Sequence, residues 1–233
     1  MKSVSPDPSI RDLSLQEGVV YATIMGLKNV KQAHIVNLLS ETLKIDPARI
    51  RQVIRNLENK GFVSSYRSES RGKPKFLTAL LDPVKEYLKE HLPNEVLSLA
   101  LDLILLDKDE QAEEGLPPLR VAYINLLKRM NIRFENIRIS GVFAILMYLV
   151  FVHHVVESAI FKTRGVDYHK IWNAYLPQLA KEKLFKIFNE VAEEVLKNEK
   201  LKQKIIDEFG NKGDLIKLFR VYLTILLISF IFT

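Results

Sequence analysis

The chain has 233 residues, of which 48% are hydrophobic and 27% charged, and this composition excludes a largely disordered protein. It contains no cysteine, which excludes disulfides, zinc–thiolate sites and cysteine catalysis and favours a reducing, cytoplasmic location. The net charge of +6 arises between Lys44 and Lys75, where nine of the 34 basic and three of the 28 acidic residues lie. Such an excess indicates a polyanionic partner for that segment, and a solvated basic face without a partner is the alternative.

Residues 1–12 are polar and lack the apolar core of a signal peptide, so we expect a flexible tail. Apolar residues then recur at helical spacing over residues 15–27 and predict a first helix. The segment KNVKQ breaks that pattern, and a short second helix is expected after it. The apolar face of the second helix consists of Ile35, Leu38, Leu39 and Leu43.

The third helix, expected over residues 47–60, has the clearest start signal in the chain. Asp46 is suited to the N-cap because its carboxylate can accept from free backbone N–H groups of the first turn. Pro47 fits the first helical position, and Gly61 fits the stop after the helix. The expected apolar stripe consists of Ile50, Val53, Ile54 and Leu57, and the polar face includes Ala48, Arg51, Gln52, Arg55 and Asn56.

Two runs of aromatic and β-favouring residues follow, over residues 62–67 and 75–80, and predict a β-hairpin with a tip at residues 68–74. The order of two helices, a capped helix and a hairpin is that of a winged helix-turn-helix. We therefore expect a winged-helix DNA-binding domain over residues 13–82 in a chain that is mainly α. Its third helix would enter the major groove, and its hairpin would be the wing.

Two stretches carry a family resemblance. RNLENKGFV resembles the end of the recognition helix in the MarR, PadR and TrmB families of transcription regulators, and RGKPKFLTALLDPVKEYLKE resembles the wing of the archaeal TrmB type. The resemblance covers residues 13–82, and no family resemblance is seen for residues 95–233. It implies sequence-specific binding of double-stranded DNA to regulate transcription. Winged helices also occur as adaptors in the transcription or replication machinery that bind mainly protein, and this alternative stays open.

The candidate contacts with DNA fall into two classes. Arginine pairs with guanine, glutamine or asparagine with adenine, and alanine contacts the thymine methyl group. The candidates for reading base edges are Ala48, Arg51, Gln52, Arg55 and Asn56. The candidates for binding phosphate or reaching the minor groove are Arg49, Lys60, Arg67, Arg71, Lys73 and Lys75.

The second half of the chain is predicted to be helical. Residues 83–118 are expected to form linker helices and an acidic loop, DKDEQAEEGLPP, and residues 119–233 an all-helical domain for dimerisation or effector binding. The segment 141–161 is long enough to span a bilayer, but its uninterrupted apolar run is 11 residues, which favours a buried core helix. The last 13 residues carry no charge, which favours burial in a homodimer. A membrane-tethered regulator is the second alternative.

No catalytic motif is found in the sequence: it contains no P-loop, no Gly-x-Ser-x-Gly, no His-Glu-x-x-His and no Rossmann glycine pattern. His154 and Glu157 have i, i+3 spacing, but we expect His153 and His154 to be hydrogen-bonded core or interface residues rather than metal ligands. We therefore predict no enzyme activity, no cofactor and no metal. A small-molecule effector is a further partner that the helical region could bind.

Overall fold

The structure, a computed structural model, describes residues 8–26, 29–106, 118–136, 138–167 and 183–232. The protein is mainly helical and has a small antiparallel sheet of three strands, as the mainly α prediction requires. It divides into two compact units: residues 1–91 with 134–145, and residues 92–133 with 146–233. The first seven residues of the predicted tail and the acidic loop at 107–117 lie outside the described residues.

The first unit contains the helices and the sheet of the predicted winged-helix region. Its helices are η1 (Ile10–Asp12), α1 (Leu15–Ile24), α2 (Gln32–Leu43), α3 (Pro47–Asn59) and α4 (Asp82–His91). Its strands are β1 (Val30–Lys31), β2 (Val63–Arg67) and β3 (Lys75–Ala79). The prediction of a flexible tail is wrong for Ile10–Asp12, because the apolar side chain of Ile10 is buried and η1 packs against α4.

The ends of α3 form as their sequence predicts. The Asp46 carboxylate accepts a hydrogen bond from the Ala48 N–H at 2.7 Å. At the other end Gly61 has φ +79°, and Phe62 N donates to Leu57 O at 2.9 Å. This is a Schellman stop, which needs a left-handed residue that glycine adopts without strain. Ile50, Val53, Ile54 and Leu57 are all buried, so the predicted apolar stripe is confirmed.

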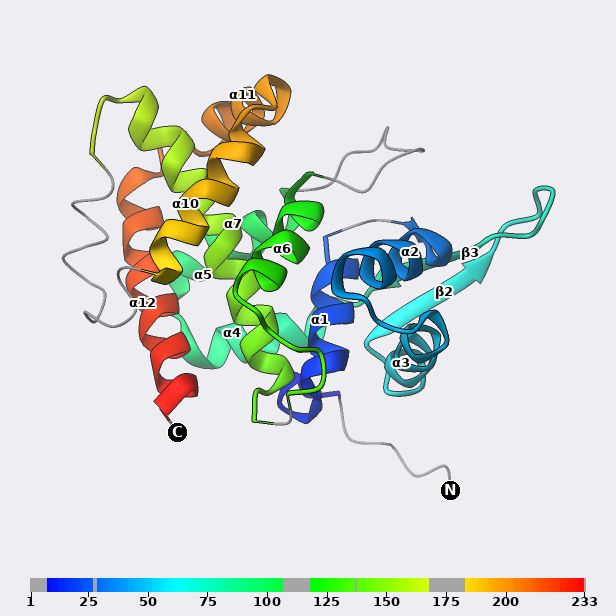
Figure 1. Cartoon of the computed structure of the whole chain (residues 1–233). Coiled ribbons are helices and arrows are strands. Elements are labelled where there is room, and N and C mark those ends of the chain that lie inside the picture. Colours follow the sequence, from blue (N-terminus) through cyan, green and yellow to red (C-terminus); the bar gives the residue numbers. More distant parts are fainter. Residues whose placement is uncertain (1–7, 27–28, 107–117, 137, 168–182, 233) are drawn as a thin grey trace. The chain divides into compact units, whose positions relative to one another are not determined.

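The sheet has the strand order β1–β3–β2, and β3 pairs antiparallel with both neighbours. The β2–β3 pairing runs from Val63 opposite Ala79 to Arg67 opposite Lys75. The hairpin formed by β2, β3 and the tip at residues 68–74 extends beyond α2 and α3 (Figure 1). The strand β1 was not predicted, because two residues are too short a run to show any periodicity.

Residues 134–145 join the first unit through close backbone contact. A Cβ atom added to Gly18 would lie 2.4 Å from the Cα of Gly141, so neither position has room for a larger side chain. Gly141 N also donates to Leu13 O at 2.9 Å. The structure therefore differs from the predicted boundaries. It places α4 and residues 134–145 in the first unit, whereas the sequence assigned them to a linker and to a C-terminal domain.

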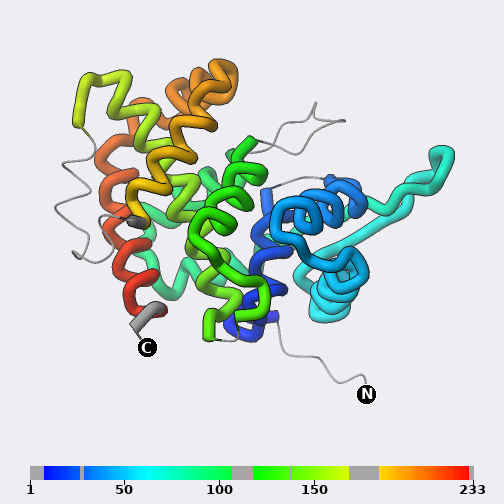
Figure 2. The backbone as a smooth tube through the Cα atoms, viewed as in Figure 1, coloured from blue at the N-terminus to red at the C-terminus, as the bar shows by residue number. Residues whose placement is uncertain are grey.

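The described part of the second unit consists of helices, and no strand is found in it. The helices are α5 (Asn94–Leu105), α6 (Pro118–Arg129), α7 (Gly141–Thr163, which begins in the first unit), α10 (Lys183–Leu196), α11 (Glu199–Phe209) and α12 (Gly213–Phe232). Helix α6 packs against α10, and α5 packs against α12 (Figure 2). Among the described residues α7 alone is long and apolar enough to cross a membrane, and its apolar window is completely buried, as the core-helix prediction requires.

The buried polar side chains of α7 have partners in the same unit. His153 Nε2–H donates to the Ile216 carbonyl at 2.6 Å, and His154 Nε2 lies 2.9 Å from Asn189 Oδ1. The prediction of hydrogen-bonded core histidines is thus confirmed. Within the described ranges, no group of three His, Cys, Asp or Glu residues could hold a metal ion. Glu157 is paired instead with Arg220 of α12 at 2.5 Å, and both side chains are buried.

Lowering the pH from 7 to 5 is expected to reduce the free energy of unfolding by about 2 kcal/mol through His153. Burial, together with the nearby positive charge of Arg220, lowers the pKa of His153 to about 3. The unfolded chain keeps the ordinary pKa of 6.5, so between these values it binds more protons than the folded chain. Stability is therefore present above pH 6.5 and is lost as the pH falls below it. Urea unfolding at several pH values measures this slope.

The matched control for this prediction is a second histidine. His153→Gln keeps a donor for the Ile216 carbonyl and removes the titrating ring, so its stability should fall less steeply with decreasing pH. His34→Gln replaces a partly exposed histidine of α2 in the same way and is the matched control variant. Equal slopes in wild type and His153→Gln would contradict the assignment.

Candidate nucleic-acid interface

The polar face of α3 is open to solvent. Four of the five predicted base-reading residues are exposed, and Asn56 is partly buried. The exposed four are Ala48, Arg51, Gln52 and Arg55. They lie opposite the buried stripe, which holds α3 against α1 and α2. Alanine, amide and guanidinium groups on an exposed helix face are the side chains that can contact base edges in a major groove.

Three of these side chains are joined by hydrogen bonds along the helix. Arg55 Nη2 donates to Gln52 Oε1 at 2.8 Å, and Gln52 Nε2 donates to Asn56 Oδ1 at 2.9 Å. The i, i+3 and i, i+4 spacings allow this chain of contacts. It orients the Arg55 guanidinium and the Gln52 amide before any ligand binds, and it leaves guanidinium N–H groups to donate outward.

Three of the six predicted phosphate ligands form ion pairs inside the first unit. Lys75 lies 2.7 Å from Glu58 of α3, and Lys60 lies 2.8 Å from Glu17 of α1. These carboxylates are only 18% and 7% exposed, so the two lysines neutralise charges that would be costly to leave unpaired. Phosphate binding by Lys60 or Lys75 therefore competes with a structural role.

Arg49 differs from those two lysines. It lies 2.8 Å from Glu135, and both side chains are well exposed. An exposed pair of this kind contributes little stability and exchanges readily with solvent. Arg49 can therefore leave Glu135 for a phosphate at little cost.

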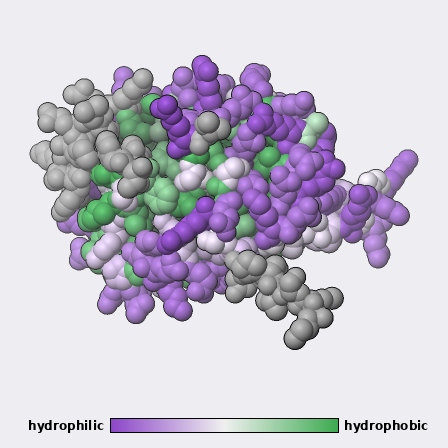
Figure 3. Space-filling view, turned by 90° about the horizontal axis from the view of Figure 1, so that it is seen from below, coloured by the Kyte–Doolittle hydropathy of each residue, from purple (hydrophilic) through white to green (hydrophobic). Residues whose placement is uncertain are grey.

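The remaining three predicted phosphate ligands are on the hairpin. Arg67, Arg71 and Lys73 are exposed and form no ion pair with the residues that the structure describes. Gly72 and Lys73 have φ values of +86° and +42°, and Ser68 N donates to Pro74 O at 3.0 Å, which closes the tip. Figure 3 shows the projecting hairpin covered by hydrophilic side chains. Glu69 is the one carboxylate in this tip.

Sequence reasoning missed an aromatic pair on the hairpin. Tyr66 of β2 and Phe76 of β3 stack with ring centroids 5.3 Å apart and an angle of 11° between the rings. Tyr66 is 51% exposed, although a tyrosine side chain is usually more buried than this. The alternation of side chains in VSSYR and KFLTA could have predicted this pair. It puts Tyr66 and Phe76 on the same face of the sheet, opposite the buried Leu77.

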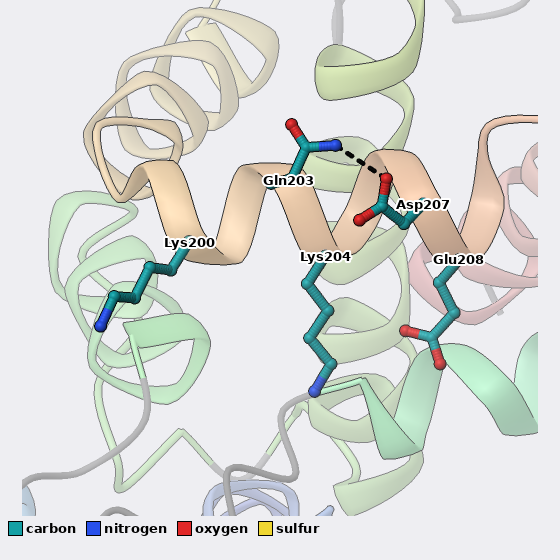
Figure 4. Close-up of a pocket in the computed structure, with 5 residues that line it drawn as sticks. All are labelled: Lys200, Gln203, Lys204, Asp207 and Glu208. Carbon is teal, nitrogen blue, oxygen red and sulfur yellow. Dashed lines mark hydrogen bonds between the residues drawn. The ribbon is translucent and has the colours of Figure 1, made fainter.

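Among the described residues, a shallow hollow on α11 is a candidate small-molecule site. It is open to solvent and is lined by five residues of this single helix, Lys200, Gln203, Lys204, Asp207 and Glu208 (Figure 4). Gln203 and Asp207 are hydrogen-bonded to each other at 2.7 Å. A hollow on one face of one helix encloses little of a ligand, so it lends no support to effector binding.

The polar face of α3 and the hairpin cations together offer two kinds of contact with a polyanion. The face of α3 carries planar donors and acceptors that suit base edges. The hairpin carries exposed cations that have no ion pair among the described residues and that suit phosphates. Comparisons with models of protein families, with curated proteins and with solved structures found no match for this chain.

Proposed function

We propose that residues 13–82 form a winged helix that binds double-stranded DNA with sequence specificity, and that the chain regulates transcription. The observation that carries the proposal is the exposed, hydrogen-bonded polar face of α3 beside a hairpin with three exposed cations that form no ion pair with the described residues. A solvated basic face without a partner needs no such ordering of its amide and guanidinium groups. The resemblance to the MarR, PadR and TrmB families supports the same function.

The contacts divide by chemistry. Helix α3 lies in the major groove, where Arg51 and Arg55 donate to guanine and Gln52 and Asn56 pair with adenine. Ala48, at the start of the helix, contacts a thymine methyl group. The hairpin cations Arg67, Arg71 and Lys73, with Arg49 on the other side of α3, bind phosphates or reach the minor groove. Lys60 and Lys75 mainly hold α3 in place.

Helix α12 supports a homodimer. Leu215, Leu218 and Ile225 are 38%, 40% and 57% exposed, and Tyr222 between them is partly exposed. Their spacing of three, four and three residues is that of an apolar seam between two helices. Exposed apolar residues in one row are a liability on a monomer, and a second copy of the helix covers them. Two winged helices joined in this way would bind half-sites about 34 Å apart, or a multiple of that distance.

Selection from a pool of fragments of the source genome, over a series of salt concentrations, tests the function and the dimer together. We expect enrichment of a palindromic fragment whose binding falls steeply with salt, because several phosphate contacts release counterions. Weak binding of all fragments that disappears near physiological salt would contradict sequence-specific recognition. Enrichment of a single, unrepeated half-site would contradict the dimer.

Replacing Arg71 and Lys73 by alanine is expected to reduce the slope of log K against log salt by about two units. Both side chains are exposed and unpaired among the described residues, so each can neutralise one phosphate. Fluorescence anisotropy of the duplex at several salt concentrations measures the slope. A double variant at Lys85 and Lys89, two exposed lysines of α4, is the charge-matched control and should keep the wild-type slope. An unchanged slope in the hairpin variant would remove the hairpin from the interface.

One observation favours the adaptor as a second candidate. The ion pairs of Arg49, Lys60 and Lys75 leave fewer free cations than the sequence suggests, and an adaptor that binds mainly protein needs fewer. The base-reading residues distinguish the two functions, because an adaptor tolerates their loss. The membrane-tethered alternative is supported by the length and composition of α7, but the burial of that helix opposes it.

A further inference from the structure

The outer face of the small sheet carries a row of one cation and two aromatic rings. In the strand register, Lys31 of β1 lies opposite Phe76 of β3, and Phe76 lies opposite Tyr66 of β2. Neighbouring residues in each strand alternate between faces, so these three share the face opposite the buried Val30 and Leu77. Within the described residues this row is only partly covered, because Tyr66 is half exposed and the other two are partly exposed.

One face of the Tyr66 ring stacks on another ring, and the other face is exposed. Its inner face stacks on Phe76, with the two rings almost parallel at 11°. Strand β2 is at the edge of the sheet, so no further strand of the described residues covers the other side of Tyr66. A third flat ring can therefore extend the stack outward from Tyr66, with the Phe76 ring behind it as support.

The charges around this stack indicate which class of molecule supplies the third ring. Lys31 lies in the same row, and Arg71 and Lys73 lie at the hairpin tip, all without an ion pair among the described residues. Glu69 is the acidic residue at the tip. A flat ring with a negatively charged group on each side is typical of a base in a nucleic-acid strand, where phosphates flank each nucleotide. In an intact duplex both faces of each internal base are covered by its neighbours, so the ring must be an unpaired or terminal base.

We propose that the outer face of the sheet is a second nucleic-acid site, at which an unpaired base of a single strand stacks on Tyr66 while Lys31, Arg71 and Lys73 contact the flanking phosphates. This site is separate from the polar face of α3 and does not require α3 to read a duplex. It gives the protein a means to bind DNA that is locally open, or a single strand, next to or instead of a duplex.

Binding of single strands by wild type, Tyr66→Ala and Tyr66→Phe tests the proposal. The probe is a fluorescein-labelled oligothymidine of about 15 nucleotides, and a fully paired duplex of the same length is the comparison. We expect Tyr66→Ala to weaken single-strand binding by about 5- to 150-fold, the range measured for loss of one stacking ring. Tyr66→Phe keeps the ring and should bind as wild type does. Duplex binding should be the same in all three.

A second measurement does not depend on the variants folding. A single strand that carries the fluorescent base 2-aminopurine should be quenched when it saturates the wild-type protein, because stacking on an aromatic ring quenches this base. Inorganic polyphosphate has no base that could stack on Tyr66. It should displace the strand, and the quenching of 2-aminopurine by the protein should then be lost. Unquenched 2-aminopurine at saturation would overturn the proposal.

The outcomes also separate this site from the proposed function. Equal single-strand affinity in wild type and Tyr66→Ala, or an equal loss for single strand and duplex, would overturn stacking of an unpaired base and leave the duplex proposal standing. Loss of single-strand binding in Tyr66→Ala, with a duplex that is not bound with any sequence preference, would overturn the proposed function and leave this site standing.

Discussion

Replacing Arg220 by methionine is expected to lower the free energy of unfolding by about 3–5 kcal/mol, the largest single effect that we anticipate in this chain. The Arg220 and Glu157 side chains are 2% and 0% exposed and lie 2.5 Å apart. Methionine fills similar space but removes the cation that lies 2.5 Å from the buried Glu157 carboxylate. Loss of one member of a buried ion pair costs free energy, because the desolvation of the other charge is then less well compensated.

Chemical unfolding followed by circular dichroism measures this change. Lys217→Met, an exposed position on the same helix, is the matched control and should change stability by less than about 0.5 kcal/mol. The double variant Glu157→Leu with Arg220→Met should recover much of the lost stability, because it removes both charges of this buried pair together. An Arg220→Met protein as stable as the Lys217→Met control would show that the pair does not hold α7 to α12.

Replacing Gln52 and Arg55 together by alanine is expected to weaken binding to the selected DNA site by about 2–6 kcal/mol, since one specific base contact is worth about 1–3 kcal/mol. Binding to random duplex should change far less, because phosphate contacts remain. Competition between the selected site and random duplex, measured by anisotropy, gives both values. Stability should be nearly unchanged, because both side chains are exposed.

The two residues are not independent, and the single variants show how they interact. Arg55 donates to Gln52, so removing either one frees the other to adopt new rotamers. Lys89→Ala on α4 removes one exposed cation without touching α3 and controls for charge alone. Equal losses on selected and random DNA would assign Arg55 to phosphate contact. No loss on either would favour the adaptor.

The local structure of the first unit could be predicted from the sequence because its signals are short in range. The Asp46 cap, the Gly61 stop and the two strands of the hairpin depend on residues within a few positions of one another. A cap, a positive φ and a period of 3.6 or 2 act through neighbouring backbone groups, so no knowledge of the remaining chain is needed. The predicted bounds of α3 and of the hairpin strands therefore agree with the structure to within one residue.

Contacts between distant segments were decided by the tertiary structure alone. Lys60 forms an ion pair with Glu17, 43 residues away, and Arg49 forms one with Glu135, 86 residues away. Two predicted phosphate ligands are therefore also ion-pair partners. The contact of Gly18 with Gly141 likewise brings residues 134–145 into the first unit. The stack of Tyr66 on Phe76 follows from strand register. Each of these depends on the path of the backbone through space, which the order of residues in a short window does not contain.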